Sequence, residues 1–236
     1  MTENTVPTSE FLLSVLWLGH AVSAGVAVPV GSGVAIRHQD QEYLATALHV
    51  AEPCGFQPLV RRYSEWASCQ WETVGTDREA DVAVLKTSTA NLSPLTPRYG
   101  LGHVILGGVG RAMGFPAITD LREISHVAEI DGLPVPLTTL VSAYVRPETN
   151  AAARIHYTGG YVNAGFSGGA MLLPTSTGWT IAGIITHREG VIRNLLRKNT
   201  TTGELEEDSE FAYSEPSGLI RFADIGVVTD IIEGAR

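Results

Sequence analysis

A serine flanked by glycines is the clearest chemical feature of this 236-residue sequence. Ser167 lies in Asn163-Ala164-Gly165-Phe166-Ser167-Gly168-Gly169, within an otherwise apolar, strand-like region. Small neighbours leave its hydroxyl exposed, and glycine lets the backbone adopt positive φ and approach a ligand closely. The N–H groups of Gly165 and Ser167 could then converge and hold a developing oxyanion. Serine alone is a weak nucleophile, so it needs a base and a group that orients that base.

His49 and Asp81 are the best candidates for the base and the orienting group. His49 follows directly after a short strand expected at 43–47, where apolar neighbours would hold it. Asp81 precedes the apolar run Val82-Ala83-Val84-Leu85, which predicts a partly buried carboxylate that fixes the tautomer of a histidine. The alternatives to Asp81 are Asp77 and Asp40. The alternatives to His49 are His20, His38, His103, His126, His156 and His187.

Composition and charge narrow the classes of function. The chain is 44% hydrophobic and 17% charged, with 25 glycines and 12 prolines, as is typical of a globular domain with many turns. The formal net charge is -9 and no long Lys/Arg block occurs, so we expect neither nucleic acid nor a membrane as a partner. Cys54 and Cys69 show no metal-ligand spacing, and we expect neither a metal nor a cofactor. A disulfide bond between Cys54 and Cys69 is the alternative to two reduced thiols, which are favoured.

The apolar stretch at 11–30 bears on localisation. The first ten residues contain two acids and no base, which does not match the start of a signal peptide. A buried first strand explains the stretch better than a membrane span does. We therefore expect a cytoplasmic protein.

Short apolar segments separated by turns predict an all-β chain, either a sandwich or a barrel. A connection around 88–100, with Pro94, Pro97 and Gly100, separates two halves of similar character. Residues 189–210 interrupt the pattern and are expected to form a long surface loop. One clear helix is expected from Ser217 to Ile232, with Ser217 as its N-cap.

These motifs together resemble the chymotrypsin-like (trypsin-like) serine peptidases, which use histidine, aspartate and serine in this chain order. The match is nearest to the bacterial Deg-type (high-temperature-requirement) branch, and it covers roughly residues 11–235. It rests on four motifs in order, which are more specific together than any one alone. They are Gly31-Ser32-Gly33-Val34, Thr46-Ala47-Leu48-His49-Val50, Asp81-Val82-Ala83-Val84-Leu85-Lys86 and the segment around Ser167, with Gly183-Ile184-Ile185 as a later strand.

The resemblance implies two six-stranded antiparallel β-barrels with a C-terminal helix. Residues 1–236 would form a single peptidase domain, with the site between the barrels and no PDZ domain after the helix. The first barrel would span about 11–90, the second about 101–216, and the helix 217–235. His49 and Asp81 would come from the first barrel and Ser167 from the second.

The implied activity is that of a serine endopeptidase working through an acyl-enzyme intermediate. Ser167 would attack the peptide carbonyl, His49 would transfer the proton, and Asp81 would orient His49. The N–H groups of Gly165 and Ser167 would hold the oxyanion. The substrate would be a protein or peptide, and a regulatory protein could activate a latent form. The alternative is a catalytically silent protein of the same fold that binds peptides or acts as a scaffold.

The resemblance also implies that Tyr161, Thr186, His187 and Arg188 bind the substrate near the cleaved bond. No acid occupies the position of Tyr161, which argues against a preference for Arg or Lys. A small or medium apolar residue is expected, with an acidic residue attracted by Arg188 as the alternative. Phe166 departs from the family, because trypsin-type members have Asp there and the Deg branch has Asn. The ion pair that activates trypsin-type zymogens is therefore unavailable, and Phe166 could disturb the oxyanion loop.

Overall fold

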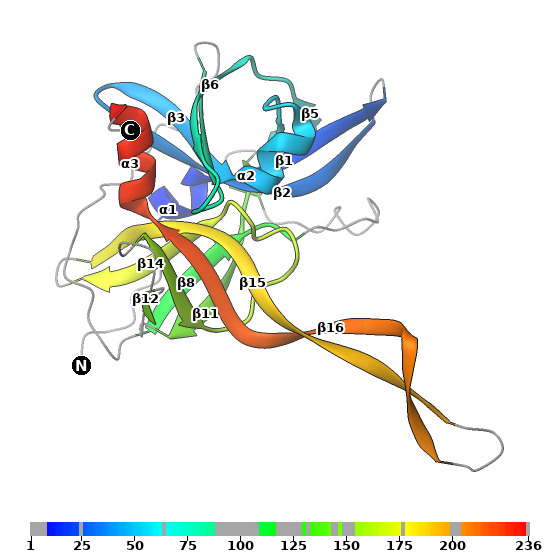
Figure 1. The fold of residues 1–236 in the computed structure, drawn as a ribbon. Helices are drawn as coiled ribbons and strands as arrows, with labels where there is room; N and C mark the ends of the chain where they lie inside the picture. Colours follow the sequence, from blue (N-terminus) through cyan, green and yellow to red (C-terminus); the bar gives the residue numbers. More distant parts are fainter. Residues whose placement is uncertain are drawn as a thin grey trace.

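Two antiparallel β-sheets and a C-terminal helix form the computed structural model of this chain (Figure 1). This arrangement confirms the expected all-β, chymotrypsin-like class. The residues that the structure describes are 9–23, 26–62, 65–87, 109–116, 129–130, 133–142, 146–147, 154–175, 178–198 and 204–234. The expected connection at 88–100 and two of the candidate histidines, His103 and His126, lie outside these ranges.

The first sheet has the strand order β5-β4-β1-β2-β3-β7-β6. A short helix, α1 (Ser9–Ser14), precedes this sheet. The start of the apolar stretch at 11–30, where a first strand is expected, is therefore helical. A one-turn helix, α2 (Leu48–Ala51), and a 3-10 turn, η1 (Glu52–Cys54), follow β3. The strands are β1 (Val15–Ser23), β2 (Val26–His38), β3 (Gln41–Ala47), β4 (Leu59–Arg62), β5 (Glu65–Ala67), β6 (Trp71–Asp77) and β7 (Val82–Thr87).

The second sheet has the order β11-β8-β14-β15-β16-β13-β12, and β9 (Glu129–Ile130) pairs separately with β10 (Leu133–Pro134). Each large sheet thus contains seven strands rather than six, and neither closes into a barrel within the described residues. One bridge between Val141 and Gly160 joins β11 to the end of β13. The strands are β8 (Val109–Gly114), β11 (Leu137–Ser142), β12 (Arg146–Pro147), β13 (Ile155–Gly159), β14 (Ala170–Thr175), β15 (Gly178–Lys198) and β16 (Leu205–Asp224).

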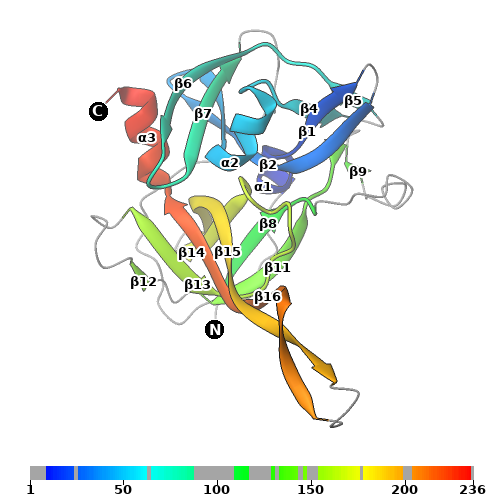
Figure 2. The same cartoon turned by 45° about the vertical axis from the view of Figure 1, so that its right-hand side comes forward.

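Two expectations for the C-terminal quarter are wrong. The segment 189–210, expected as a loop, lies largely in β15 and β16, whose outer parts extend beyond the rest of the molecule as a two-stranded arm (Figure 2). The helix α3 (Ile225–Glu233) begins eight residues later than expected, because 217–224 completes β16. Asp224 rather than Ser217 caps α3, and its side chain accepts the N–H of Gly226 at 2.7 Å.

One apolar core joins the two sheets. Trp17 of β1 stacks on Phe115, just after β8, with ring centroids 5.2 Å apart and an interplanar angle of 8°. Helix α3 leaves the second sheet and packs against β6 and β7 of the first. Buried residues of this core come from both sheets and α3, including Val34, Ile36, Val82, Val84, Met113, Leu172, Ile184, Val227, Val228 and Ile231. This shared core fixes the relative position of the two sheets, and therefore of residues on either side of the junction.

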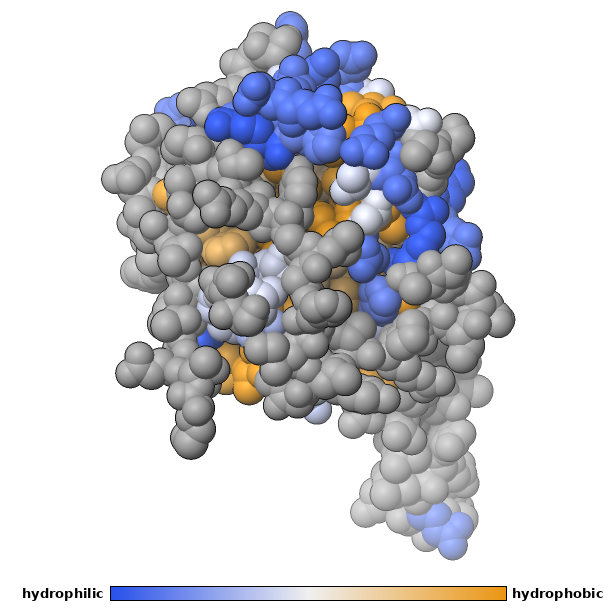
Figure 3. All heavy atoms as spheres, turned by 90° about the vertical axis from the view of Figure 1, so that its left-hand side faces the viewer, coloured by the Kyte–Doolittle hydropathy of each residue, from blue (hydrophilic) through white to orange (hydrophobic). Residues whose placement is uncertain are grey.

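Hydrophilic side chains cover much of the first sheet on the face shown in Figure 3, with hydrophobic residues visible between them. In the described part of the chain, no helix combines the length and apolar character needed to cross a membrane. Cys54 and Cys69 are free and buried. Burial raises the pKa of both thiols, and for Cys69 the nearby Arg62 acts in the opposite direction.

Candidate active site

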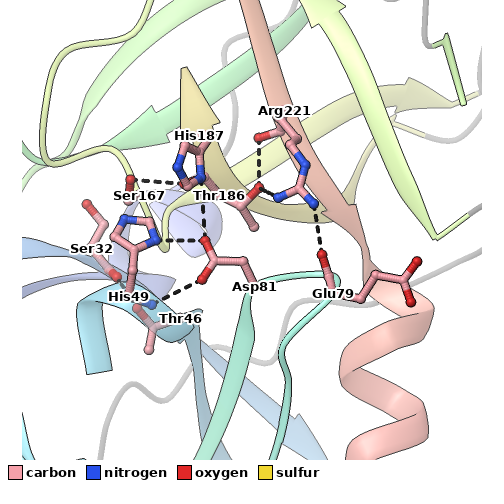
Figure 4. A network of polar contacts seen from close by, with 9 residues as sticks. All are labelled: Ser32, Thr46, His49, Glu79, Asp81, Ser167, Thr186, His187 and Arg221. Atoms are coloured by element: carbon pink, nitrogen blue, oxygen red, sulfur yellow. Dashed lines mark hydrogen bonds and ion pairs between the residues drawn. The ribbon is translucent and has the colours of Figure 1, made fainter. Parts of the chain in front are cut away.

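Three hydrogen bonds join Asp81 to His49 and its neighbour Leu48. His49 lies in α2, directly after β3, and Asp81 lies at the start of β7 (Figure 4). The N–H of Leu48 donates to the carbonyl of Asp81 at 3.0 Å, and the N–H of His49 donates to Oδ1 at 3.1 Å. The ring Nδ1 of His49 lies 2.7 Å from Oδ2. Asp81 adopts a φ of 58°, in the left-handed region that aspartate adopts more readily than most non-glycine residues.

The carboxylate of Asp81 is kept ionised. Its side chain is only 15% exposed, and this burial acts to raise the pKa. Hydrogen bonds from His187 and His49 outweigh burial and hold the pKa of Asp81 well below its ordinary value. An ionised carboxylate at this place can orient the imidazole of His49 and stabilise its protonated form.

Neither alternative to Asp81 reaches His49. Asp77 is buried, and its Oδ1 accepts the N–H groups of Glu79 and Ala80 at 3.0 Å each. It therefore holds the turn that presents Asp81. Asp40, with a φ of 63°, lies in the turn between β2 and β3.

Of the other described histidines, His187 alone joins this group. Its Nδ1 lies 3.5 Å from Oδ2 of Asp81, and its ring centroid lies 5.1 Å from that of His49. The hydrogen bond to Asp81 raises the pKa of His187 against the opposing effect of burial. His38 lies instead against Glu233, and His156 against Asp224. His20 lies in β1.

A bulge in β15 explains how His187 reaches Asp81. Ile185 pairs with Phe222 and His187 pairs with Arg221, so Thr186 is an extra residue between them. Ile185 and Thr186 are both buried, which breaks the usual alternation of a strand, and His187 then turns outward. Bulges commonly re-aim side chains next to active sites in this way.

The Ser167 loop is bound to the first sheet through Ser32 of β2. The N–H of Ser32 donates to the carbonyl of Ser167 at 2.8 Å. Its hydroxyl donates to the carbonyl of Gly165 and accepts the N–H of Phe115, each at 2.8 Å. Thr46 of β3 completes the junction by donating to the carbonyl of Ser32 at 2.7 Å. In the sequence, Gly31-Ser32-Gly33 is part of a motif typical of the family, but no local pattern indicates that Ser32 binds the Ser167 loop.

Close packing explains why two glycines follow Ser167. Gly168 has a φ of 85°, and a Cβ there would lie 1.9 Å from the carbonyl oxygen of Ser32. A Cβ on Gly169 would lie 2.1 Å from the carbonyl oxygen of Met113. The loop therefore enters the junction of the two sheets at a distance that only glycine permits.

The two amides expected to hold an oxyanion are available. Gly165 adopts a φ of 95°, which its glycine backbone allows. The N–H groups of Phe166, Gly168 and Gly169 donate to backbone carbonyls at 2.7–3.2 Å. By contrast, the N–H groups of Gly165 and Ser167 donate to no group within the described ranges. An incoming oxyanion could accept both.

Phe166 anchors this loop. Its side chain is 2% exposed and packs in an apolar cluster of the second sheet with Met171, Ile185 and Phe222. A Cβ on Gly114 would lie 2.9 Å from the Phe166 ring, so the ring also packs closely against β8. The structure thus places apolar packing at the position where trypsin-type peptidases carry an aspartate.

Ser167 donates its hydroxyl to the carbonyl of Thr186 at 3.2 Å. It makes no hydrogen bond with His49 within the described part of the chain. Catalytic hydrogen bonds are often loose without substrate and tighten when it binds.

Arg221 of β16 is a site residue that sequence reasoning missed. Its guanidinium donates to the hydroxyl of Thr186 at 3.2 Å and to the carbonyl of Glu79 at 2.8 Å. It thereby connects the bulge of β15 to the turn that presents Asp81 in the other sheet. The sequence offers no signal for this contact, because 142 residues separate Arg221 from Glu79.

The residues expected to bind substrate have different environments. Tyr161 is 69% exposed, and Arg188 is also exposed. The side chain of Thr186 is fully buried against Arg221, which leaves its backbone as the part near Ser167. His187 faces Asp81 with 56% of its side chain exposed.

Comparison with known proteins gives a structural likeness only. No family model matches the sequence, and no curated protein does. The HtrA-type protease AlgW, solved with a decapeptide, superposes with a TM-score of 0.59 at 20% identity, over 95% of this chain and 66% of that one. A serine endoprotease from Yersinia pestis gives a TM-score of 0.58 at 20% identity, over 98% and 70%.

A third structure has nearly the same length as this chain. The MamO protease domain from Magnetospirillum magneticum superposes with a TM-score of 0.52 at 17% identity, over 94% of this chain and 96% of that one. In contrast, this chain spans about two thirds of AlgW and of the Yersinia protein. At such low identity the likeness establishes the fold. The chain therefore has the trypsin-like fold of an HtrA-type protease domain.

Proposed function

We propose that this chain is a serine endopeptidase. The observation that carries the proposal is the 2.7 Å hydrogen bond between Nδ1 of His49 and Oδ2 of Asp81, together with a serine whose glycine-rich loop is bound to the same sheet through Ser32. The complexes of AlgW with peptides support a peptide or protein as the substrate class. Peptide hydrolysis would proceed through an acyl-enzyme on Ser167.

The proposed mechanism assigns one task to each group. The Oγ of Ser167 attacks the carbonyl carbon, and Nε2 of His49 accepts its proton and later donates it to the leaving amine. Asp81 keeps Nδ1 of His49 protonated, so that Nε2 carries the lone pair. The N–H groups of Gly165 and Ser167 stabilise the oxyanion, a contribution of about 3 kcal/mol per donor in related chemistry.

A catalytically silent peptide-binding protein is the second candidate. The observation that favours it is the hydrogen bond of Ser167 to Thr186, which engages the hydroxyl away from His49. The same bond fits a latent enzyme, in which a partner or substrate must reorient the hydroxyl. The silent protein and the latent enzyme both predict that Ser167 of the chain alone attacks a substrate slowly or not at all.

Covalent labelling with a fluorophosphonate, read by intact mass, tests the proposal. We expect one adduct on the wild-type chain and none on Ser167→Ala or His49→Ala. The control is His20→Ala, which removes a histidine of β1 outside the site and should label normally. Loss of Ser167 or His49 should lower kcat by about 10⁴- to 10⁶-fold on any peptide that the wild type cleaves.

Absence of an adduct on the wild type would contradict an assembled enzyme. Repeating the reaction with cell extract then separates the remaining readings. Labelling of Ser167 that depends on the extract would identify a latent peptidase with a regulatory partner. No labelling under either condition would leave the peptide-binding protein as the function.

We propose a cytoplasmic location for this peptidase. The two free, buried cysteines support it, because reduced thiols are typical of cytosolic proteins. Fractionation of cells that produce the full-length protein would test the proposal, and recovery outside the cytoplasmic fraction would contradict it.

A further inference from the structure

Three atoms of the kind that bind metals converge at Asp81. The Nδ1 atoms of His49 and His187 lie 2.7 and 3.5 Å from Oδ2 of Asp81, and the three residues each offer a ligand atom within 4.8 Å of the other two. Imidazole nitrogen and carboxylate oxygen are favoured ligands of zinc and similar divalent transition metals. We propose that His49, Asp81 and His187 form a binding site for a zinc-type divalent ion, and that the bound ion inhibits the peptidase.

The distances fit such an ion with small adjustments. Tetrahedral zinc with ligands at about 2.0–2.1 Å places neighbouring ligand atoms roughly 3.3 Å apart. The contact of His187 with Asp81 is already at 3.5 Å, and that of His49 with Asp81 must widen from 2.7 Å. The third edge, between one ring nitrogen of each histidine, is at most 4.8 Å and closes by rotation of the side chains.

The surroundings of the three ligands also fit. Oδ1 of Asp81 accepts the N–H of His49 at 3.1 Å, which fixes the carboxylate and leaves Oδ2 to face the two rings. Such outer contacts orient metal ligands and strengthen binding. The side chains of His49 and His187 are 44% and 56% exposed, so an ion can enter from solvent and keep water in the fourth position.

Metal binding and the proposed peptidase reaction exclude one another. The reaction needs the proton of His49 on Nδ1 and the lone pair on Nε2. A metal on Nδ1 binds the lone pair that this nitrogen carries in the other tautomer, so the proton of the neutral ring resides on Nε2, where it blocks acceptance of the Ser167 proton. The metal also occupies the carboxylate oxygen that orients His49. This consequence rests on the proposed function, whereas the binding site does not.

Direct binding of zinc, measured by calorimetry on the full chain carrying Ser167→Ala, tests the site without any need for activity. We expect saturation at one zinc ion per chain. Adding His187→Ala should weaken binding by at least about tenfold, since loss of even an outer partner of a ligand costs 10- to 100-fold. Adding His20→Ala, the matched control, should leave binding unchanged. His187 is largely exposed, so its removal should not disturb folding.

Cobalt(II) provides a second measurement on the same chains. We expect visible absorption bands of a four-coordinate site that disappear with His187→Ala and with Asp81→Asn. A sulfur-to-cobalt charge-transfer band would place the metal on Cys54 or Cys69 and overturn the proposal. Equal zinc affinity with and without His187 would overturn it as well.

The inhibitory role is tested separately on the wild-type chain. Zinc should suppress fluorophosphonate labelling of Ser167, a chelator should restore it, and His187→Ala should need at least tenfold more zinc for the same suppression. Zinc that binds at the site without slowing the labelling would overturn the inhibition. A chain that binds zinc but never labels, even with chelator, would contradict the proposed function and leave the metal site standing.

Discussion

Gly168 shows how strictly single residues define the nucleophile loop. Its φ of 85° and the carbonyl of Ser32 both act against any side chain at this position. Phe166 acts in the opposite way, because its buried ring supplies the attachment that the glycines cannot. Half-buried Ser167 thus lies between a bulky side chain that packs in the core and two glycines that leave room for the neighbouring backbone.

Gly168→Ala should separate the loop from the first sheet. The added Cβ would lie 1.9 Å from Ser32 and 2.3 Å from the hydroxyl of Thr46, and the positive φ alone costs about 1–3 kcal/mol. We expect a loss of stability in urea unfolding above that range, together with loss of fluorophosphonate labelling. The matched control is Gly55→Ala, at a φ of 57° with no atom near the new Cβ. Equal losses from both substitutions would contradict the steric explanation.

The candidate site residues can be picked out from the sequence at this scale, whereas the residues that support them cannot. Ser167, His49 and Asp81 each lie in a local motif of glycines or apolar residues that the sequence displays. Ser32 acts by contacts with Gly165 and Phe115, far away in the chain. Such contacts depend on how the two sheets meet, and no local pattern encodes that arrangement.

Among the elements, β15 and β16 determine the shape of the site. The bulge at Thr186 turns His187 towards Asp81, and Arg221 on the neighbouring strand fixes the bulge through the Thr186 hydroxyl. The same guanidinium reaches the turn before β7 by donating to Glu79. Arg221 is therefore a positioning residue, one that acts through its neighbours on both sheets.

Arg221→Met should keep the apolar stem of the side chain and remove these hydrogen bonds. Bonds to charged donors contribute about 1.5–3 kcal/mol, so we expect a stability loss of that size. The rate of labelling at Ser167 should fall, with Arg221→Lys restoring part of it. Arg78→Met is the control, because the Arg78–Glu52 pair is highly exposed and should contribute little. Labelling at the wild-type rate in Arg221→Met would contradict the positioning role.

The error in the last helix has a physical cause at the same scale. The segment 217–224 contains apolar residues that satisfy a helical period, yet Ile220 and Phe222 also alternate with Leu219 and Arg221 as in a strand. The segment 217–224 pairs with both β13 and β15, and this pairing stabilises it as a strand. Asp224 then caps the helix that follows. The two-stranded arm of β15 and β16 is not predicted from the sequence, because the polar residues of 189–210 suggest a loop. Composition does not show that two segments will pair as strands.

For the whole molecule, the shared core predicts cooperative unfolding. Trp17 and Phe115 stack across the sheets, and α3 joins them a second time. Chains above about 150 residues often unfold in stages, but a common core opposes separation. In a Trp17→Phe, Trp179→Phe chain the remaining tryptophans, Trp66 and Trp71, lie in the first sheet and report on it alone. Their fluorescence should change at the same urea concentration as circular dichroism, which reports on both sheets; two distinct midpoints would contradict the prediction.

The two-sheet architecture itself could be predicted, because each half contains short apolar strands and ordered motifs. The number of strands and the closure of the sheets could not. Short strands such as β5 and β12 contain only three and two residues, too few to show a period. Their pairing partners lie elsewhere in the chain and become evident only in the folded molecule.

The division of the site between the sheets has a consequence for protein synthesis. His49 and Asp81 emerge from the ribosome with the first sheet, long before Ser167, and Arg221 follows later still. A nascent or truncated chain therefore carries a base without a nucleophile and cannot cut its neighbours. Cutting ability would arise only when the last strand of the second sheet has docked, so the proposed reaction would itself report that the two sheets have folded together.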